Sequence, residues 1–318
     1  MKISVVVSTY NSENLLPRLL KSLVAQDYRN KEIIVVDDGS TDRTVEAAKK
    51  FKNVKVFSRK HMGPAAQRTF GAKAAKGDIV FFTDSDCVAP KGLLKGIAMN
   101  FQKHDIAGCG GTYKTLNKKS SVARFVGYEI GWRHSKQVGY TDFLGTYCCA
   151  YKRDIFLKFG GFNPTFKTAS GEDPELSFKI FSGGHKLLFD KTLFVWHSHP
   201  NSLKKYLKQQ FYRAYWRVSL YNKHPKKMGG DVYTGREIPY SPIMMAAFIF
   251  SLFSSAVMPV SAYLSVISIA AFFAIYLGFF NFVYKRERRM LPISIAIIFL
   301  RTISWLFGFA YGLKLLKK

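Results

Sequence analysis

Cysteine is scarce in this sequence, and its placement argues against a disulfide or metal framework. Only 4 of the 318 residues are cysteine. None of them forms a Cys-x-x-Cys pair, and Cys148 and Cys149 are adjacent. Disulfide scaffolds and zinc sites need cysteines at regular, paired spacing. We therefore expect reduced, packed thiols in a cytosolic domain.

Acidic residues are also few, at 21 against 48 lysines and arginines, which gives a net charge of +27 and a pI near 9.9. A charge of this size leaves nucleic acid, acidic lipid head groups and phosphorylated substrates as partners. The sequence has no helix-turn-helix, zinc-finger or RNP-type signature, so nucleic acid ranks lowest. It also begins without the pattern of a secretory signal peptide, and we expect no such leader.

Charge is missing altogether from residues 240–283, a run of 44 residues. A helix needs about 20 residues to cross a bilayer, so this run is long enough for two crossings with a break near Pro259. Residues 1–240 hold 20 of the 21 acids and 40 of the 48 bases. This contrast predicts a soluble N-terminal part and a membrane domain over residues 239–318.

The sequence leaves open whether the chain crosses the membrane a third time. Residues 291–313 are apolar apart from Arg301, and a basic cluster at 285–289 precedes them. If the front of the chain is cytosolic, a hairpin returns this cluster to the cytosol, as the positive-inside rule requires. A third crossing would export the C-terminal lysines against that rule. We expect a multi-pass protein of the cell membrane with two or three crossings and its front domain in the cytoplasm.

Residues 202–227 carry eight lysines and arginines, no acids, and several aromatic residues. A basic, aromatic helix beside a membrane segment is typical of the lipid interface, so we expect residues 201–238 to bind anionic lipids. Arg213 and Arg217 share one helical face and could also contact a phosphate of a donor or acceptor.

The front of the chain alternates strand and helix patterns. Buried-strand patterns are followed in turn by amphipathic ones, which predicts an α/β sheet with parallel strands, right-handed crossovers and helices on both faces. The Gly110-Gly111 pair suggests a bend in a later strand. The expected strands are 3–9, 32–36, 54–58, 79–82, 105–113 and 187–195, and the expected early helices are 15–23, 44–51 and 64–76.

Strand 79–82 runs directly into Asp84-Ser85-Asp86. Unpaired charge is costly beside a core, so these acids point to a ligand beyond the carboxyl end of the strand, where open α/β sheets bind ligands. Two carboxylates there suit Mg²⁺ or Mn²⁺ bridging a nucleotide diphosphate. Because Asp-x-Asp is common in loops, a solvated turn is the alternative.

Two other strands end in polar residues that belong to the same edge of the predicted sheet. Thr9 ends the first strand, and Asp37 and Asp38 end the second. Taken singly, either aspartate could instead cap the following helix. Taken together with Asp84 and Asp86, they predict one ligand-binding crevice.

These motifs together resemble family 2 inverting glycosyltransferases of the GT-A fold. The resemblance covers about residues 1–200 and implies a domain that takes a sugar from a nucleotide-diphosphate sugar. It is carried, in order along the chain, by residues 5–11, 34–42, 63–78, 83–86, and 160–163 followed by 171–173.

The resemblance also implies roles for individual residues. It implies that the nucleotide sugar is bound by Thr9, Asp37, Asp38, Arg68, Asp84 and Ser85. Asp86, together with Asp84, would carry the metal. The family's asparagine after Arg68 is Thr69 here, which leaves that contact open.

Asp173 is implied to be the general base, which takes a proton from an acceptor hydroxyl during in-line attack at the anomeric carbon. Glu172 opens the same helix; it could complement the helix dipole or contact the acceptor. His197 ends the last strand and is a candidate metal ligand, with ordinary packing as the alternative.

The sequence therefore predicts an inverting glycosyltransferase whose acceptor is a hydroxyl of a lipid-linked saccharide. Polyprenyl or dolichyl phosphate is the alternative acceptor, and because it is already ionised it would need no base. Two further alternatives are a catalytically inactive scaffold, which would not need Asp84, Asp86 and Asp173, and nucleotidyl transfer, which has no need for Asp173. Sugar, nucleotide and oligomeric state cannot be read from the sequence.

Overall fold

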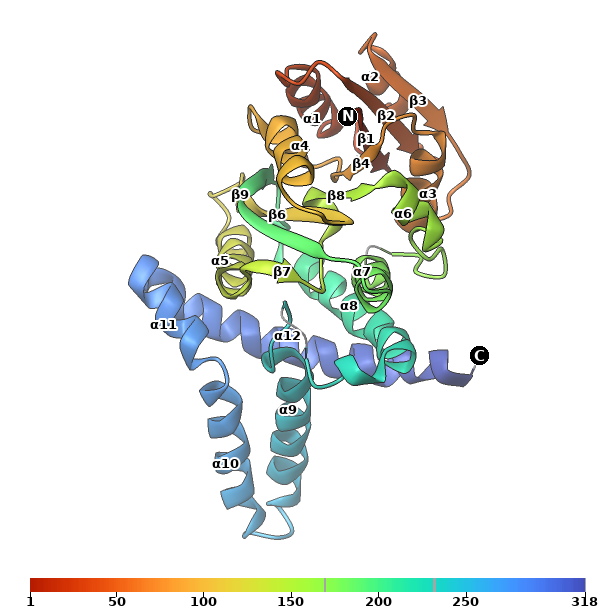
Figure 1. The fold of residues 1–318 in the computed structure, drawn as a ribbon. Helices are drawn as coiled ribbons and strands as arrows, with labels where there is room; N and C mark the ends of the chain where they lie inside the picture. Colours follow the sequence, from red (N-terminus) through yellow and green to blue (C-terminus); the bar gives the residue numbers. More distant parts are fainter. Residues whose placement is uncertain (169, 231–232, 318) are drawn as a thin grey trace. The chain divides into compact units, whose positions relative to one another are not determined.

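The computed structural model describes residues 1–168, 170–230 and 233–317. The chain forms two compact units, each built from two segments (Figure 1). Unit 1 comprises Met1–Leu116 and Gln137–Ser198, and unit 2 comprises Asn117–Lys136 and His199–Lys318. Residues 117–136, which lie within the predicted 1–200 domain, thus group with the C-terminal part of the chain.

The first half of unit 1 is a parallel sheet, as the alternating sequence pattern predicts. Its four strands lie in the order β3-β2-β1-β4, and each neighbouring pair is parallel. The strands are β1 (Ile3–Thr9), β2 (Lys31–Asp37), β3 (Val54–Ser58) and β4 (Ile79–Phe82), joined by helices α1 (Leu16–Val24), α2 (Thr44–Lys49) and α3 (Pro64–Ala74).

Both faces of this sheet are covered by helices, which confirms the predicted layering. Val5 of β1 packs in a buried cluster with Leu19 of α1 and Leu94 of the later helix α4. The next residue, Val6, points to the opposite face and packs in a cluster that contains Ala65 of α3 and Phe156. Successive side chains of a strand point to opposite faces, so one strand supplies both cores.

The second half of unit 1 extends the sheet with mixed strand directions. β8 pairs antiparallel with β4, and β6 pairs parallel with β9. The β6–β9 register shifts between Gly110 and Thr112, which confirms the bend expected at the glycine pair. These elements are β5 (Cys87–Val88), α4 (Leu93–Lys103), β6 (Gly108–Thr115), β7 (Gly139–Thr141), β8 (Cys149–Lys152), α6 (Arg153–Lys158), α7 (Glu172–Ser182) and β9 (Leu187–His197).

Unit 2 is helical. In Figure 1 its helices α9 and α10 form a hairpin that projects from the rest of the unit, and their break at residues 255–260 agrees with the expected break near Pro259. The helices are α5 (Ser121–Lys136), α8 (Leu203–Lys223), α9 (Glu237–Ser254), α10 (Ser261–Ala274), α11 (Leu277–Arg286) and α12 (Leu291–Gly312).

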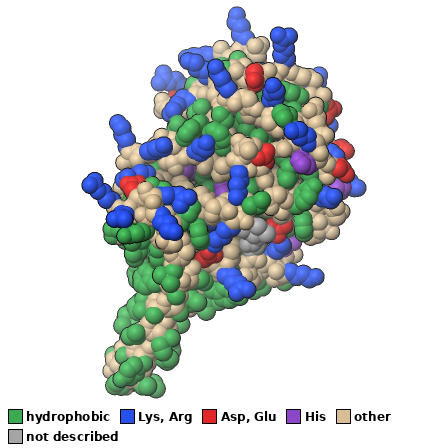
Figure 2. All heavy atoms as spheres, turned by 60° about the vertical axis from the view of Figure 1, so that its left-hand side comes forward, with side chains coloured by type: hydrophobic (Ala, Val, Ile, Leu, Met, Phe, Trp, Pro, Cys, Tyr) green, Lys and Arg blue, Asp and Glu red, His purple; other side chains and the backbone are tan. Residues whose placement is uncertain are grey.

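Two helices of the described chain are long and apolar enough to cross a membrane: Glu237–Ser254 and the stretch Arg288–Leu316. The count rises to three if α10 and α11, which are bent by 51° at their junction, act as one span. The side chains on the projecting hairpin are hydrophobic or neutral in Figure 2, whereas lysine and arginine are spread over the rest of the visible surface. These features make the C-terminal helices candidate membrane anchors.

Candidate active site

The ends of β1 and β2 bring Thr9 and Asp37 side by side in register. Both residues are buried, at 3% and 1% exposure. Asp37 Oδ2 accepts hydrogen bonds from the Ser40 amide at 3.1 Å and the Ser58 hydroxyl at 3.2 Å. Within the described part of the chain, Thr9 Oγ1 and Asp37 Oδ1 have no hydrogen-bond partner. Buried polar atoms are rarely left unpaired, so these two atoms are candidates for contacts with a ligand.

The Asp38 carboxylate holds a neighbouring loop. It accepts hydrogen bonds from the amides of Met62 at 2.7 Å and Gly63 at 3.0 Å, and the His61 ring lies 3.0 Å away. Gln67 also donates to it. The contact between Asp38 and a nucleotide therefore stays a prediction, because these oxygens already have partners.

Helix capping does not explain the aspartates at the end of β2. Helix α2 begins after Arg43, and the Thr44 amide is bonded to Asp42 Oδ1 at 3.0 Å. Asp42, rather than Asp37 or Asp38, therefore accepts a hydrogen bond from the first amide of this helix. The capping alternative is wrong for both residues.

Arg68 joins the end of β4 to the start of α7. Its guanidinium, which is 3% exposed, donates to Asp84 Oδ1 at 2.7 Å and to Glu172 Oε1 at 2.8 Å. Glu172 is 1% exposed and also accepts the Ser170 amide at 2.8 Å. Burial raises the pKa of Glu172, and the charge of Arg68 limits that rise. Arg68, predicted to bind the nucleotide sugar near its diphosphate or base, is thus held between two carboxylates.

Asp86, Cys87 and His197 form a cluster whose ligand atoms all lie within 4.8 Å of one another. Cys87 of β5 pairs with His197 of β9, and His197 Nε2 lies 3.4 Å from Asp86 Oδ1. The imidazole stacks on Tyr113 with ring centroids 5.0 Å apart, which fixes its orientation. Carboxylate oxygens suit Mg²⁺ and Mn²⁺, so Asp86 is compatible with the predicted metal, whereas the buried thiol of Cys87 is a poor ligand for either ion.

Cys87 is a member of this cluster that the sequence motifs did not predict. The residue is a free, buried cysteine, as expected, and the only available signal was its position directly after Asp86. Asp84 bonds to Arg68, so its predicted role as a second ligand would have to be shared with that contact. Ser85 Oγ lies 3.1 Å from Ser12 Oγ, which ties the loop after β4 to the loop after β1.

Asp173 is the second residue of α7 and is half-buried. The preceding Gly171 has φ +109°, and a Cβ there would lie 2.7 Å from the Phe166 ring, so this turn requires glycine. Burial alone lowers the pKa of Arg68, but Asp84, Glu172 and Asp173 together raise it. The Asp173 carboxylate therefore acts on the same guanidinium that holds Asp84.

Three other predicted residues have different surroundings. The Thr69 hydroxyl accepts the Phe162 amide at 2.9 Å and donates to the Phe162 carbonyl at 3.2 Å, so it fixes the loop before α7. Arg213 is exposed, and Arg217 donates to the Tyr221 hydroxyl at 3.3 Å. Both arginines belong to unit 2, and their contacts with a donor or acceptor phosphate stay predictions.

Comparison with known proteins identifies the domain. Residues 4–158 match the family model described as Glycosyl transferase family 2. The family 2 glycosyltransferase domain predicted from the motifs is thus confirmed over residues 4–158, just under half of the chain. Its mixed sheet with flanking helices matches solved structures of the GT-A fold.

Individual relatives cover the chain to different extents. The poly(ribitol-phosphate) beta-N-acetylglucosaminyltransferase TarS of Staphylococcus aureus is 40% identical over 111 residues, which are 33% of this chain and only 19% of that protein. The O-antigen chain rhamnosyltransferase RfbN of Salmonella typhimurium is 27% identical over 224 residues, 66% of this chain and 71% of that one. These relatives support glycosyl transfer.

Among solved structures, the mannosyltransferase PcManGT from Pyrobaculum calidifontis, in complex with GDP-Man and Mn²⁺, matches with a TM-score of 0.58. The match covers 96% of this chain and 87% of that one at 20% sequence identity. At this identity the likeness establishes the fold alone.

Proposed function

We propose that this protein is an inverting, metal-dependent glycosyltransferase that moves a sugar from a nucleotide-diphosphate sugar to a hydroxyl of a lipid-linked saccharide. The observation that carries the proposal is the double contact of Arg68 with Asp84 and Glu172. It brings the loop that would hold the donor to the helix that begins with Glu172 and Asp173. An inactive scaffold would not need these carboxylates in one place.

The nucleotide would bind at the ends of β1 and β2. Asp37 Oδ1 is a hydrogen-bond acceptor for an N–H of the base or a ribose hydroxyl, and the Thr9 hydroxyl can both donate and accept. Asp84 and Ser85 would lie toward the sugar and diphosphate. The relatives transfer different sugars by name, so neither sugar nor nucleotide is carried over from them.

Asp86 and His197 would hold the cation, Mg²⁺ or Mn²⁺. When bound, the cation supplies positive charge against the diphosphate leaving group. PcManGT was solved with Mn²⁺, which supports a divalent metal in a site on this fold. Asp84, already held by Arg68, would be a weaker ligand than Asp86.

Asp173 would act as the general base. Its carboxylate accepts the proton of the acceptor hydroxyl while the hydroxyl oxygen attacks the anomeric carbon from the face opposite the diphosphate. The bond from that carbon to the phosphate oxygen breaks, and the configuration inverts. Asp173 lies in the first turn of α7, where the helix dipole complements an acidic side chain.

The acceptor would be borne by a lipid. The apolar α9–α10 hairpin is a candidate anchor, and it would keep the enzyme where lipid-linked acceptors are found. The expected location is the cell membrane, with unit 1 in the cytoplasm. Polyprenyl phosphate remains the competing acceptor, since it attacks with an oxygen that is already ionised.

The test is a screen of the purified full chain against a panel of nucleotide sugars, with lipid extract as acceptor and Mg²⁺ or Mn²⁺ added. We expect one donor to be consumed and its sugar to appear on a lipid. A chain that binds donors but transfers none, with every extract and metal, would favour the inactive scaffold. Release of sugar 1-phosphate, with the nucleoside monophosphate attached to the acceptor, would favour nucleotidyl transfer.

A further inference from the structure

Helices α8 and α12 of unit 2 lie side by side. Near the middle of α12, the Ser304 hydroxyl donates to the Leu207 carbonyl of α8 at 2.8 Å. One residue further along, the Trp305 indole N–H donates to Gln210 Oε1 at 3.1 Å. A side chain can bond to the backbone of a neighbouring helix only if that helix is close. Helices α8 and α12 are therefore in close contact.

Small residues extend this contact toward the end of α12. A Cβ on Gly308 would lie 2.4 Å from the Phe211 carbonyl oxygen, and a Cβ on Gly312 would lie 2.7 Å from the Tyr215 carbonyl oxygen. Both glycines sit four residues apart and face backbone, which cannot move aside like a side chain. Glycine at this spacing is the usual way for two helix backbones to approach closely. The two helices are therefore packed together over several turns.

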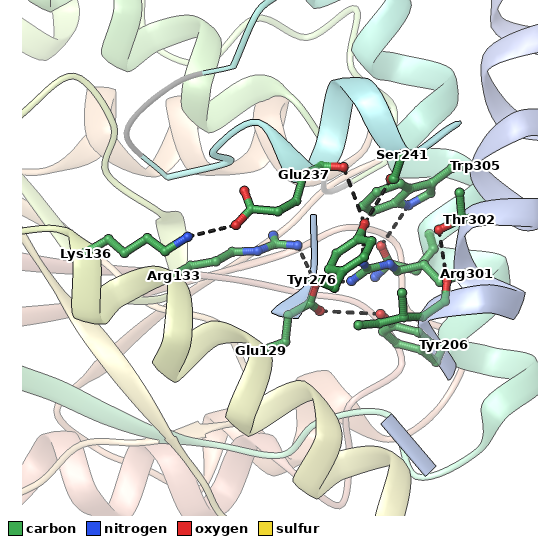
Figure 3. Close-up of polar contacts among 12 residues, drawn as sticks. Glu129, Arg133, Lys136, Tyr206, Glu237, Ser241, Tyr276, Arg301, Thr302 and Trp305 are labelled. Carbon is green, nitrogen blue, oxygen red and sulfur yellow. Dashed lines mark hydrogen bonds and ion pairs between the residues drawn. The ribbon is translucent and has the colours of Figure 1, made fainter. Parts of the chain in front are cut away.

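Arg301, the one charged residue of α12, forms an ion pair with a residue of helix α5. Arg301 is 1% exposed and pairs with Glu129 of α5, which is bound by Arg133 as well (Figure 3). Tyr206 of α8 donates to Glu129 at 3.4 Å, and Arg301 donates to the Tyr276 hydroxyl at 3.1 Å. The middle of α12 is thus anchored to α5 and α8.

Helix α8 is unsuited to the hydrocarbon of a bilayer. Helix α8 carries six lysines and arginines and no acid, and charged side chains are strongly disfavoured at the bilayer centre. If α12 crossed the membrane in this packing, it would have to carry α8 with it. The six residues are Lys204, Lys205, Lys208, Arg213, Arg217 and Lys223.

We propose that α12 does not cross the membrane but lies in the interface of an anionic bilayer together with α8. Only the α9–α10 hairpin would insert. In Figure 1, α12 runs across the direction of this hairpin. The exposed large side chains of α12 are apolar and would contact the acyl chains, while the lysines and arginines of α8 would contact acidic head groups. The C-terminus then stays on the same side as unit 1.

Sidedness is tested with single introduced cysteines in the full chain, because the four native cysteines are buried. Lys314→Cys reports the end of α12, and Lys91→Cys reports unit 1; both positions are exposed. We expect a membrane-impermeant maleimide to label both positions in the same population of sealed vesicles. Labelling of Lys314→Cys only after permeabilisation, in vesicles where Lys91→Cys is already accessible, would overturn the proposal.

Depth is tested at Leu300, which lies near the centre of α12 and is 38% exposed. A fluorophore on Leu300→Cys should be quenched most by lipids brominated close to the head group. A crossing helix would place this residue at the bilayer centre, so stronger quenching by bromine near the ends of the acyl chains would contradict an interfacial α12. Absence of quenching by every brominated lipid would show that α12 does not contact the membrane and would also overturn the proposal.

Discussion

Arg68 and Glu172 are 104 residues apart in sequence and form an ion pair of 2.8 Å in which both side chains are at most 3% exposed. The same guanidinium holds Asp84 at 2.7 Å. One buried side chain thus connects the loop after β4 to the start of α7. Removing a single partner from such a pair leaves a buried charge without compensation, which is costly in a protein interior.

Arg68→Met should therefore lower the free energy of unfolding by about 3–5 kcal/mol and abolish transfer. The double variant Arg68→Met/Glu172→Leu should be more stable than the single variant, because it no longer buries an unpaired carboxylate at position 172. The other partner of Arg68, Asp84, is partly exposed and can be solvated by water. Thermal unfolding in detergent measures both changes. Equal stability of the single variant and the parent would show that the pair contributes nothing to the fold.

Strands β1, β2 and β4 could be predicted from the sequence because each contains a short apolar run that is followed by polar residues. The run before Asp84 matched β4 (Ile79–Phe82), and the first strand matched β1 (Ile3–Thr9). The grouping of α5 with the C-terminal helices could not be predicted. It depends on Glu129 meeting Arg301 across 172 residues, and no local pattern contains that contact.

Asp86→Ala should remove metal-dependent donor binding and transfer while leaving the thermal midpoint within a few degrees of the parent. The side chain is 31% exposed and lies beyond the end of β4, so its loss opens no cavity in the core. Asp105→Ala is a matched control, since that carboxylate is 98% exposed. Normal turnover of Asp86→Ala with added Mg²⁺ or Mn²⁺ would contradict the assigned metal site.

Glu32 should make the fold sensitive to acid. Burial alone would raise the pKa of this carboxyl, but hydrogen bonds from Lys55, Ser4 and the Lys76 amide lower it from 4.5 to about 2. A lowered pKa in the folded state stabilises the protein above pH 4.5, and the contribution is lost as the pH falls toward 2. Because solvent screens this partly exposed carboxylate, the contribution is about 1 kcal/mol.

The measurement is the thermal midpoint of Glu32→Gln and the parent across this pH range. We expect the variant to be less stable at pH 7 and the difference to shrink as the pH falls below 4.5. A difference that stays constant down to the lowest pH at which both remain folded would mean that ionised Glu32 does not stabilise the fold.

Gly308→Val should disrupt the packing of α12 on α8. The added side chain meets the Phe211 carbonyl, and overpacking of this kind typically costs about 1–3 kcal/mol. Ala310→Val provides the control, because it adds bulk to the same helix at an exposed position. The half-life in detergent at elevated temperature should fall for Gly308→Val and stay near the parent value for Ala310→Val. Equal half-lives of the two variants would argue against the close contact.

The acids at the strand ends, Asp37, Asp84 and Asp86, stand out in the sequence because charge beside a buried strand is unusual, whereas the role of Asp173 is implied only by the family resemblance. What Arg68 binds could not be found in this way, since Asp84 and Glu172 come from separate parts of the chain. For the same reason, the sequence predicts Cys87 only as a packed thiol and does not place it near His197. Its approach to His197 depends on the pairing of β5 with β9, and β5 is only two residues long.

The central claim is that Asp173 takes the proton of an acceptor hydroxyl, and Asp173→Asn tests it most directly. Asp154→Asn is the matched control, because it makes the same change in the first turn of α6 at an exposed position. Donor affinity and the transfer rate are measured for both variants with the nucleotide sugar found in the screen. We expect Asp173→Asn to keep its donor affinity and to lose transfer by about 100-fold or more, while Asp154→Asn stays near the parent. Near-parent transfer by Asp173→Asn, on a saccharide or on polyprenyl phosphate, would contradict this claim.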